Sequence, residues 1–152
     1  MIVRHPVRVV FLCVGNSCRS QMAEGFARHK YPNLMEPQSA GTHPAPVVQP
    51  ETIACMEEKG VGLDGHASKP VSAIDWDKVD LLINMSGRPV LGFLPPFKGG
   101  SLIWNVKDPI GKSPEIYREV RDQIETLVDR LAVTLRKQHH PRRRKGDKAR
   151  EG

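Results

Sequence analysis

The sequence predicts an α/β fold in which helices cover both faces of a sheet of parallel strands. Short apolar runs rich in β-branched residues alternate along the chain with segments of helical periodicity, and this order is typical of a parallel sheet. The first run passes through a polar, glycine-containing loop into a helical segment, as a βαβ unit begins. A length of 152 residues suits one domain with a single core.

Three apolar runs, the first, third and fourth strand segments, are expected to form buried strands, and residues 35–40 could form a short second strand. The four strands correspond to residues 7–12, 35–40, 79–85 and 102–104. The segments expected to be helices are residues 20–29, 50–60 and 113–135. Ser20 and Ser113 are placed to cap the first and third helices, and Pro50 suits the first position of the second. The third helix carries a continuous apolar stripe on one face.

The net positive charge of the chain comes from its C-terminal residues. The formal net charge is +6, and residues 136–152 contain eight Lys and Arg residues against two acidic ones, so the preceding part is neutral overall. We therefore expect residues 1–137 to form one domain and residues 138–152 to be a basic, disordered tail. A nucleic-acid-binding protein is not indicated, although weak binding of the tail to polyanions is an alternative.

Cysteine content and hydropathy indicate a reducing, aqueous compartment. Three cysteines, Cys13, Cys18 and Cys55, are too few for a disulfide-stapled scaffold, so free thiols are expected. No run of about 18 apolar residues predicts a membrane span, and the N-terminus lacks the features of a signal peptide. We expect a cytoplasmic protein with no membrane partner, and the sequence indicates no oligomeric state.

The segment from Cys13 to Ser20 contains the residue types needed to bind a phosphate-like oxyanion. The N–H groups of a tight loop that enters a helix converge on one point, where the helix dipole adds positive potential. Gly15 and Asn16 tolerate the positive φ that such a loop requires, and the guanidinium of Arg19 can bind two oxygens at once. The expected phosphate-binding residues are Val14, Gly15, Asn16, Ser17, Cys18 and Arg19.

Cys13 is the candidate nucleophile because it begins this loop. The positive potential there favours the thiolate at neutral pH, and the hydroxyl of Ser20 is placed to donate a hydrogen bond to the sulfur. The alternative is a small buried cysteine at a strand end followed by an ordinary turn at Gly15 and Asn16. That alternative does not explain why Cys, Gly, Asn, Arg and Ser occur together in eight residues between a strand and a helix.

Other ligand classes are disfavoured by spacing. A zinc site would need a second pair of Cys or His residues beside Cys13 and Cys18, which the sequence lacks. The glycine-rich motifs of nucleotide-binding loops are also absent. We expect neither a metal nor a cofactor.

A thiolate that attacks phosphorus needs a proton donor for the departing oxygen. Asp108 follows the fourth predicted strand and should therefore lie at the same edge of the sheet as Cys13. On chemistry alone the alternatives are Asp64, Asp75 and Asp77.

These motifs resemble those of the low-molecular-weight protein tyrosine phosphatases and of the arsenate reductases that share their fold. The resemblance covers roughly residues 7–137 and is carried by the C-x5-R-S loop at Cys13, by residues 22–24 and 39–42, by His66 and by Asp108-Pro109. It implies a three-layer fold with a central, twisted sheet of four parallel strands. It also implies a phosphocysteine or arsenocysteine intermediate.

By matched position, the resemblance makes Cys13 the nucleophile, Arg19 the oxyanion binder, and Asp108 the general acid and then the base. Four further positions match residues that hold the loop in shape and tune the thiolate: Asn16, Ser20, Ser39 and His66. For His66 the alternative is a surface histidine without such a role.

This chain differs from both the arsenate reductases and the tyrosine phosphatases of the family, and the differences bear on its function. Ser17, Gln21 and Gly25 look more like the arsenate reductases, but thioredoxin-coupled reductases use two further cysteines after the third strand, and residues 85–91 contain none. Cys55 lies in the second predicted helix and is expected to be a buried structural thiol. An internal disulfide relay is therefore not expected.

Tyrosine phosphatases of the family place aromatic residues around the pocket at two positions. This chain has His43-Pro44-Ala45-Pro46 and Ile110-Gly111 there, so selectivity for phosphotyrosine is not indicated. The leading hypothesis is hydrolysis of a phosphomonoester, either a phosphorylated protein or a small molecule. One alternative is arsenate reduction with an external thiol or redox protein, and another is a non-catalytic phosphate sensor. A protective disulfide between Cys13 and Cys18 is a further open hypothesis.

Overall fold

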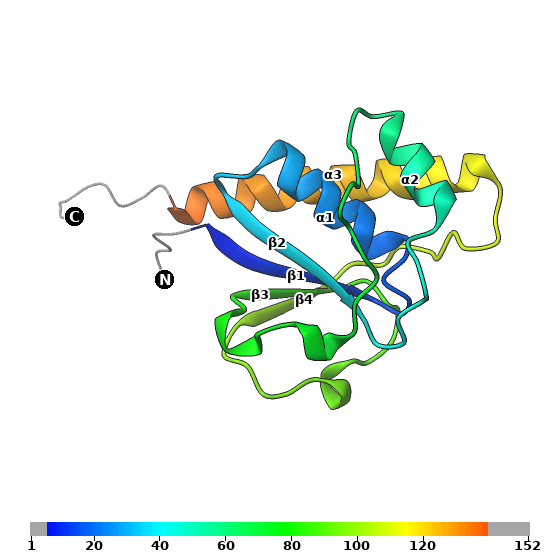
Figure 1. Ribbon diagram of the computed structural model, residues 1–152. Coiled ribbons are helices and arrows are strands. Elements are labelled where there is room, and N and C mark those ends of the chain that lie inside the picture. Colours follow the sequence, from blue (N-terminus) through cyan, green and yellow to red (C-terminus); the bar gives the residue numbers. More distant parts are fainter. Residues whose placement is uncertain (1–5, 140–152) are drawn as a thin grey trace.

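The computed structural model describes residues 6–139, and this part of the chain forms one sheet of four parallel strands. The strands lie in the order β2-β1-β3-β4 (Figure 1). Their bounds are Val7–Cys13 for β1, Met35–Gly41 for β2, Leu81–Asn84 for β3 and Gly100–Ile103 for β4. The α-helices described are α1 (Arg19–Lys30), α2 (Pro50–Glu57) and α3 (Pro114–His139). The predicted α/β fold with a four-stranded parallel sheet is confirmed.

Both faces of β1 are covered, which explains why the first apolar run does not alternate with polar residues. Phe11 belongs to the core shared with α1, α2 and α3, which lie together on one side of the sheet (Figure 1). Leu12 belongs to a second core on the opposite face, with Trp76. That face is covered by two 3-10 helices, η1 (Val71–Ala73) and η2 (Trp76–Lys78). The third layer is therefore built from short helical turns rather than long helices.

The N-terminus of α1 differs from the prediction. The helix begins at Arg19, and its N-cap residue is Cys18, whose side chain makes no capping hydrogen bond. The prediction that Ser20 caps this helix is wrong, because Ser20 already lies within the first turn. Its hydroxyl contacts the sulfur of Cys13 and accepts a hydrogen bond from the side chain of Asn16.

The other two α-helices begin as predicted. Pro50 is in the first turn of α2, and the N–H of Ile116 donates to the hydroxyl of Ser113 at 3.4 Å at the start of α3. α3 continues to His139, two residues beyond the predicted domain boundary. The remainder of the predicted basic tail, residues 140–152, lies outside the described residues.

α3 buries the apolar stripe that the sequence predicts. The stripe residues that are buried are Val120, Ile124, Val128, Leu131 and Leu135. The opposite face is exposed and, apart from residues such as Val133, polar, so α3 is amphipathic. None of the helices between residues 6 and 139 combines the length and apolar character needed to cross a membrane.

The fourth strand corrects a prediction. Residues 102–104 are predicted to be a buried strand, but β4 is an exposed edge strand that pairs only with β3 in the described sheet. Leu102 is 47% exposed and Ile103 is 70% exposed. Trp104, just after the strand, is buried and its ring lies 5.8 Å from that of Phe11. An apolar run predicts a strand, but it does not reveal the position of that strand in the sheet.

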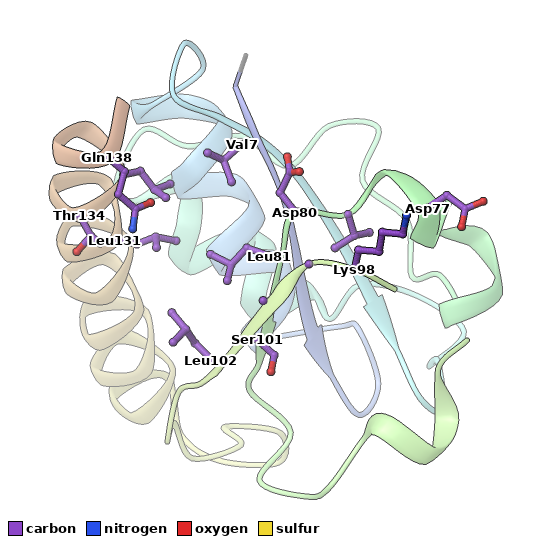
Figure 2. A pocket seen from close by; sticks show the side chains of 14 residues that line it. Val7, Asp77, Asp80, Leu81, Lys98, Ser101, Leu102, Leu131, Thr134 and Gln138 are labelled. Atoms are coloured by element: carbon purple, nitrogen blue, oxygen red, sulfur yellow. The ribbon is translucent and has the colours of Figure 1, made fainter. Parts of the chain in front are cut away.

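A groove of about 660 Å³ lies between this exposed edge and the C-terminal half of α3. Figure 2 shows Leu102 of β4 facing Leu131 of α3, with the side chains of Thr134 and Gln138 farther along the helix. Asp80 and Lys98 lie on the rim beside the start of β3 and β4 (Figure 2). Leu131 and Leu135, which belong to the buried apolar stripe of α3, line the groove on the side of the helix.

The strand register brings the carboxyl ends of all four strands to one edge of the sheet. Cys13 pairs with Gly41, Leu12 with Asn84, and Asn84 with Ile103. The loops that follow the strands therefore meet at this edge, which is where ligands of parallel sheets bind.

The buried stripe of α3 predicts a stability effect. Ile124→Ala should lower the free energy of unfolding by about 2–5 kcal/mol, because the fully buried side chain leaves a cavity. The matched change Val133→Ala, on the exposed face of the same helix, should alter it by less than about 0.5 kcal/mol. Urea unfolding of both variants measures the difference, and equal losses would contradict the assigned helix face.

Candidate active site

The loop of residues 13–19, called the anion loop here, connects β1 to α1 and is bent at Asn16. Asn16 has φ of 51° and is the one non-glycine residue in the described chain with positive φ. Gly15, also expected to use this conformation, does not adopt it. Asn16 is held there because its side-chain oxygen accepts hydrogen bonds from the Lys69 N–H at 2.7 Å and from Gln21 at 3.1 Å. Asn16 is fully buried, so these bonds satisfy a polar group without water.

The carbonyl groups of the anion loop are directed into the loop that follows β2. Backbone N–H groups of Thr42, His43, Ala45 and Gln49 donate in turn to the carbonyls of residues 13, 14, 15 and 17, at 2.8–3.2 Å. By contrast, the N–H groups of residues 14–17 find no acceptor within the described chain. In a trans peptide the N–H of the following residue points away from the carbonyl, so the N–H groups of residues 14, 15, 16 and 18 are directed away from the loop after β2. Val14, Gly15, Ser17 and Cys18 line the pocket on that other side.

Close contact between these two loops depends on Gly41. A Cβ atom at this position would lie 2.5 Å from the carbonyl oxygen of Val14 and 2.9 Å from the backbone nitrogen of Asn16. Backbone atoms cannot move aside as a flexible side chain would, so only glycine fits. Gly41 is thus a required residue of the site, although sequence analysis noted it only as part of the matched 39–42 segment.

Cys13 lies at the floor of a pocket of about 230 Å³. The residue is 2% exposed, and its sulfur lies 2.9 Å from the hydroxyl oxygen of Ser20. Asn16 Nδ2 donates to that same hydroxyl oxygen at 2.8 Å, which leaves the single proton of Ser20 free to be donated to the sulfur. A hydrogen bond to the charged form stabilises a thiolate.

Arg19 is buried beside Cys13 and is fixed by carbonyls from two other loops. Its Nη1 donates to the carbonyl oxygen of Met85 at 2.7 Å and to that of Val106 at 3.2 Å. Its Nη2 lies 3.6 Å from a carboxylate oxygen of Asp108. One side of the guanidinium is therefore anchored to the protein, while the other is available to an oxyanion in the pocket.

Asp108 lies at the mouth of the same pocket, as its position after β4 predicts. Its side chain is 46% exposed, and one carboxylate oxygen accepts a hydrogen bond from the N–H of Ile110 at 3.1 Å. This bond orients the carboxylate across the pocket from Cys13. The three alternatives do not line the pocket: Asp64, Asp75 and Asp77.

The predicted supporting residues Ser39 and His66 do not contact the anion loop directly. His66 Nδ1 lies 2.8 Å from the side-chain oxygen of Gln21, and Gln21 Nε2 donates to the carbonyl of Asn16 at 3.0 Å. Ser39 donates to the carboxylate of Glu24 instead. Gln21 is thus the residue through which His66 reaches the loop.

Glu24 and Arg28 complete this network. The buried carboxylate of Glu24 pairs with Arg28, and Arg28 Nη1 lies 3.3 Å from Nε2 of His66. Burial lowers the pKa of His66, which favours the neutral imidazole near pH 7. The signal that could have identified Gln21 and Glu24 from sequence is their position among the apolar residues on the buried side of α1.

A further support of the loop had no signal in the sequence. Ser68 donates its hydroxyl proton to the carbonyl of Gly15 at 3.0 Å, and the adjacent Lys69 donates its backbone N–H to the side chain of Asn16 at 2.7 Å. Both lie in an irregular segment between α2 and η1. Neither residue type nor spacing distinguishes them from ordinary loop residues.

The other two cysteines are buried thiols. Burial raises the pKa of Cys18, whose sulfur lies 3.7 Å from the hydroxyl of Tyr117. Burial also raises the pKa of Cys55 to about 11, and the expectation that this thiol is buried in the second helix is confirmed. All three cysteines are free in this structure. Across residues 6–139, no three His, Cys, Asp or Glu side chains gather as a metal-binding group.

Comparison with known proteins places these features in a family. Residues 8–141 match the family model described as low molecular weight phosphotyrosine protein phosphatase. A glutaredoxin arsenate reductase of Synechocystis sp. is 39% identical, over 84% of this chain and 98% of its own length. A protein-arginine-phosphatase of Geobacillus stearothermophilus is 33% identical, over 86% of this chain and 97% of its own length.

Solved structures agree with both of these likenesses. An arsenate reductase in the phosphate binding state has a TM-score of 0.76 and 34% identity, covering 85% of this chain and 98% of that one. The YwlE arginine phosphatase from Geobacillus stearothermophilus has a TM-score of 0.82 and 27% identity, covering 91% and 99%. The chain thus resembles two branches with different chemistry on one fold.

The contact at Gly41 predicts loss of oxyanion binding. Gly41→Ala should weaken inorganic phosphate binding by about tenfold or more, because the new Cβ displaces the N–H groups that converge on the pocket. Gly62→Ala is the matched control, since no atom lies within 4 Å of the Cβ position there. Calorimetric titration with phosphate measures the affinity of both variants. Equal affinities would contradict the prediction, because they would show that the anion loop binds phosphate even when a Cβ at position 41 pushes it away from the loop after β2.

The lowered pKa of His66 predicts an acid dependence of stability. As pH falls below the ordinary value of 6.5, the unfolded chain takes up a proton before the folded chain does, so stability is full above that pH and declines below it. His66→Gln should reduce the slope of unfolding free energy against pH between about 7 and 5. An unchanged slope in urea titrations of the variant would contradict this.

Proposed function

Because the chain belongs to the low molecular weight phosphotyrosine protein phosphatase family, we propose that it hydrolyses phosphate monoesters through a covalent intermediate on Cys13. The observation that carries this proposal is one pocket lined by Cys13, Arg19 and Asp108. The nucleophile and the oxyanion binder come from the two ends of the anion loop, the proton donor comes from the loop after β4, and all three line one pocket of about 230 Å³.

In the first step, the phosphate dianion of the ester binds to the N–H groups of the anion loop and to the free side of Arg19. The thiolate of Cys13 attacks phosphorus, so an S–P bond forms as the bond from phosphorus to the ester oxygen breaks. Asp108, in its protonated form, donates its proton to the departing oxygen. The alcohol or phenol leaves, and phosphocysteine remains.

In the second step, a water molecule attacks the phosphocysteine. Asp108, now a carboxylate, accepts a proton from this water as the new P–O bond forms and the S–P bond breaks. Cys13 departs as a thiolate, which the proton of Ser20 stabilises across the 2.9 Å contact. Release of inorganic phosphate returns the enzyme to its starting state.

The segment after β3 argues against an internal disulfide relay. It contains no cysteine, and its first turn is fixed by its own side chains. Ser86 donates to the side-chain oxygen of Asn84 at 2.7 Å and accepts from the N–H of Arg88 at 3.1 Å, while Asn84 donates to the carbonyl of Arg88 at 2.8 Å. Phosphocysteine hydrolysis requires no second thiol, so this segment is compatible with the proposed reaction.

Arsenate reduction with an external thiol is the second candidate. The 39% identical relative named a glutaredoxin arsenate reductase favours it. Arsenate would bind as phosphate does and form a Cys13–S–As bond with loss of water. An external thiol would then attack the Cys13 sulfur, releasing arsenite as the S–As electron pair moves to arsenic. A second thiol would reduce the resulting mixed disulfide.

A paired assay tests both candidates. Wild-type protein should hydrolyse an aryl phosphate, Cys13→Ser should not, and Asp108→Asn should be slower by about 10²- to 10⁴-fold. In parallel, oxidation of a supplied thiol is measured with and without arsenate. Full phosphatase activity in Cys13→Ser would overturn the mechanism, while arsenate-dependent thiol oxidation without ester hydrolysis would select the second candidate. Phosphate binding with neither activity would indicate a sensor.

A further inference from the structure

The ion pair between Asp108 and Arg19 occupies the side of the guanidinium that is open to the pocket. A carboxylate oxygen of Asp108 lies 3.6 Å from Nη2 of Arg19, and this is the one ion pair that Asp108 makes in the described chain. Nη1 of the same guanidinium is already bound to the carbonyls of Met85 and Val106. Asp108 therefore uses the side of Arg19 that an oxyanion would also use.

This ion pair conflicts with the part that Asp108 plays in the proposed first step. As the partner of a guanidinium, Asp108 is a carboxylate, but the departing ester oxygen needs a proton from it. Its side chain is 46% exposed, so the solvent can deliver a proton to it. The N–H of Ile110, which donates to the same carboxylate at 3.1 Å, does not depend on Arg19. Loss of the ion pair would thus leave Asp108 in place and open to protonation.

A dianion in the pocket changes the charge around Asp108 in one direction. The pocket holds about 230 Å³ and is lined by Cys13, Arg19 and Asp108 together, so a bound dianion lies close to all three. It takes the side of the guanidinium that Asp108 uses, and it places two negative charges beside the carboxylate. Both changes favour the protonated acid, because an opposite charge nearby favours ionisation of a carboxyl group and a like charge disfavours it.

Other titratable and charged groups lie near Asp108. They come from the anion loop, the loop after β2, α3 and the loop of Asp108 itself: Cys13, Cys18, His43, Tyr117, Lys107 and Lys112. Burial raises the pKa of Cys18 and that of Tyr117, so both stay protonated. The two lysines are cations, to which an anion cannot add a proton. Cys13 and His43 are therefore the groups, besides Asp108, whose protonation a bound anion could change.

We propose that the binding of an oxyanion displaces Asp108 from Arg19 and is coupled to the uptake of one proton by Asp108. This inference rests on the proposed function and describes how the general acid of that site is protonated. The proton comes from the solvent, passes to the departing oxygen in the first step and leaves with the alcohol or phenol. Phosphocysteine keeps negative charge beside Asp108, so the same repulsion makes the carboxylate a stronger base toward water in the second step.

Sulfate tests this coupling without any turnover, because it remains a dianion throughout the experiment and takes up no proton itself. Cys13→Ser serves as the parent protein, since it lacks the thiol whose protonation could also change. Calorimetric titration of this parent in buffers of different ionisation enthalpy should show uptake that approaches about one proton per sulfate. The affinity of the parent for sulfate should rise as the pH falls from about 8 to about 6.

Asp108→Asn in this parent gives the main comparison. The amide is neutral and does not compete for the guanidinium, so sulfate should bind about tenfold more tightly than to the parent at about pH 8, without proton uptake. A residue that only supported the loop would instead lower the affinity when replaced. Asp64→Asn is the matched control and should behave as the parent, because Asp64 is exposed and does not line the pocket. His43→Gln should keep the proton uptake.

The outcomes separate this inference from the proposed function. The coupling is overturned by equal sulfate affinities of the parent and Asp108→Asn at about pH 8, by proton uptake that persists in Asp108→Asn, or by its loss in His43→Gln. Failure of the parent to bind sulfate would also overturn it, since the anion loop would then hold no dianion. Absence of ester hydrolysis in the paired assay would instead overturn the function and leave the measured proton uptake in place.

Discussion

The orientation of the peptide groups in the anion loop is fixed by the pairing of β1 with β2. Where β1 ends, the loop after β2 continues alongside it and donates N–H groups to the carbonyls of residues 13, 14, 15 and 17. The opposite ends of these peptides are thereby directed inward, where an anion can neutralise them. The site is in this sense an extension of the sheet: its donors are backbone groups, and the strand register orients them. The side chains of Arg19 and Asp108 are added to a loop whose backbone N–H groups are already oriented by the sheet.

Most of the candidate site could be placed from the sequence because its residues are close together in the chain. Cys13 and Arg19 lie in one short segment between a strand and a helix, and their types suffice to indicate a bound oxyanion. Asp108 could be placed beside them because parallel strands end at a common edge. The network around His66 could not be predicted in detail, since it depends on which side chains α1 directs at the irregular segment after α2. Ser39 illustrates this, because it bonds to Glu24 rather than to the loop.

The wrong predictions about the fold also concern features that depend on contacts between distant segments. Ser20 has the chemistry of a helix cap, and its use as a partner of Cys13 becomes evident only when the sulfur is placed 2.9 Å away. Likewise, the apolar character of Leu102 and Ile103 is that of an interior strand, but position in a sheet is a property of topology and not of composition. The rings of Phe93 and His43, whose centroids are 5.9 Å apart, join two loops that the sequence separates by a complete helix and strand. Long-range contacts between irregular segments leave no periodic signal.

The exposed edge of the sheet has a consequence for the protein in concentrated solution. β4 presents one row of backbone donors and acceptors that no strand of the described chain covers, beside two apolar side chains. Such an edge can template the addition of a strand from another molecule, which is a route to aggregation. The short length of β4 limits this risk of aggregation. Its four residues begin with a glycine and a serine, so they offer few hydrogen bonds and little apolar area to a strand of another molecule. The short length of β4 therefore limits self-association of the protein through this edge of the sheet.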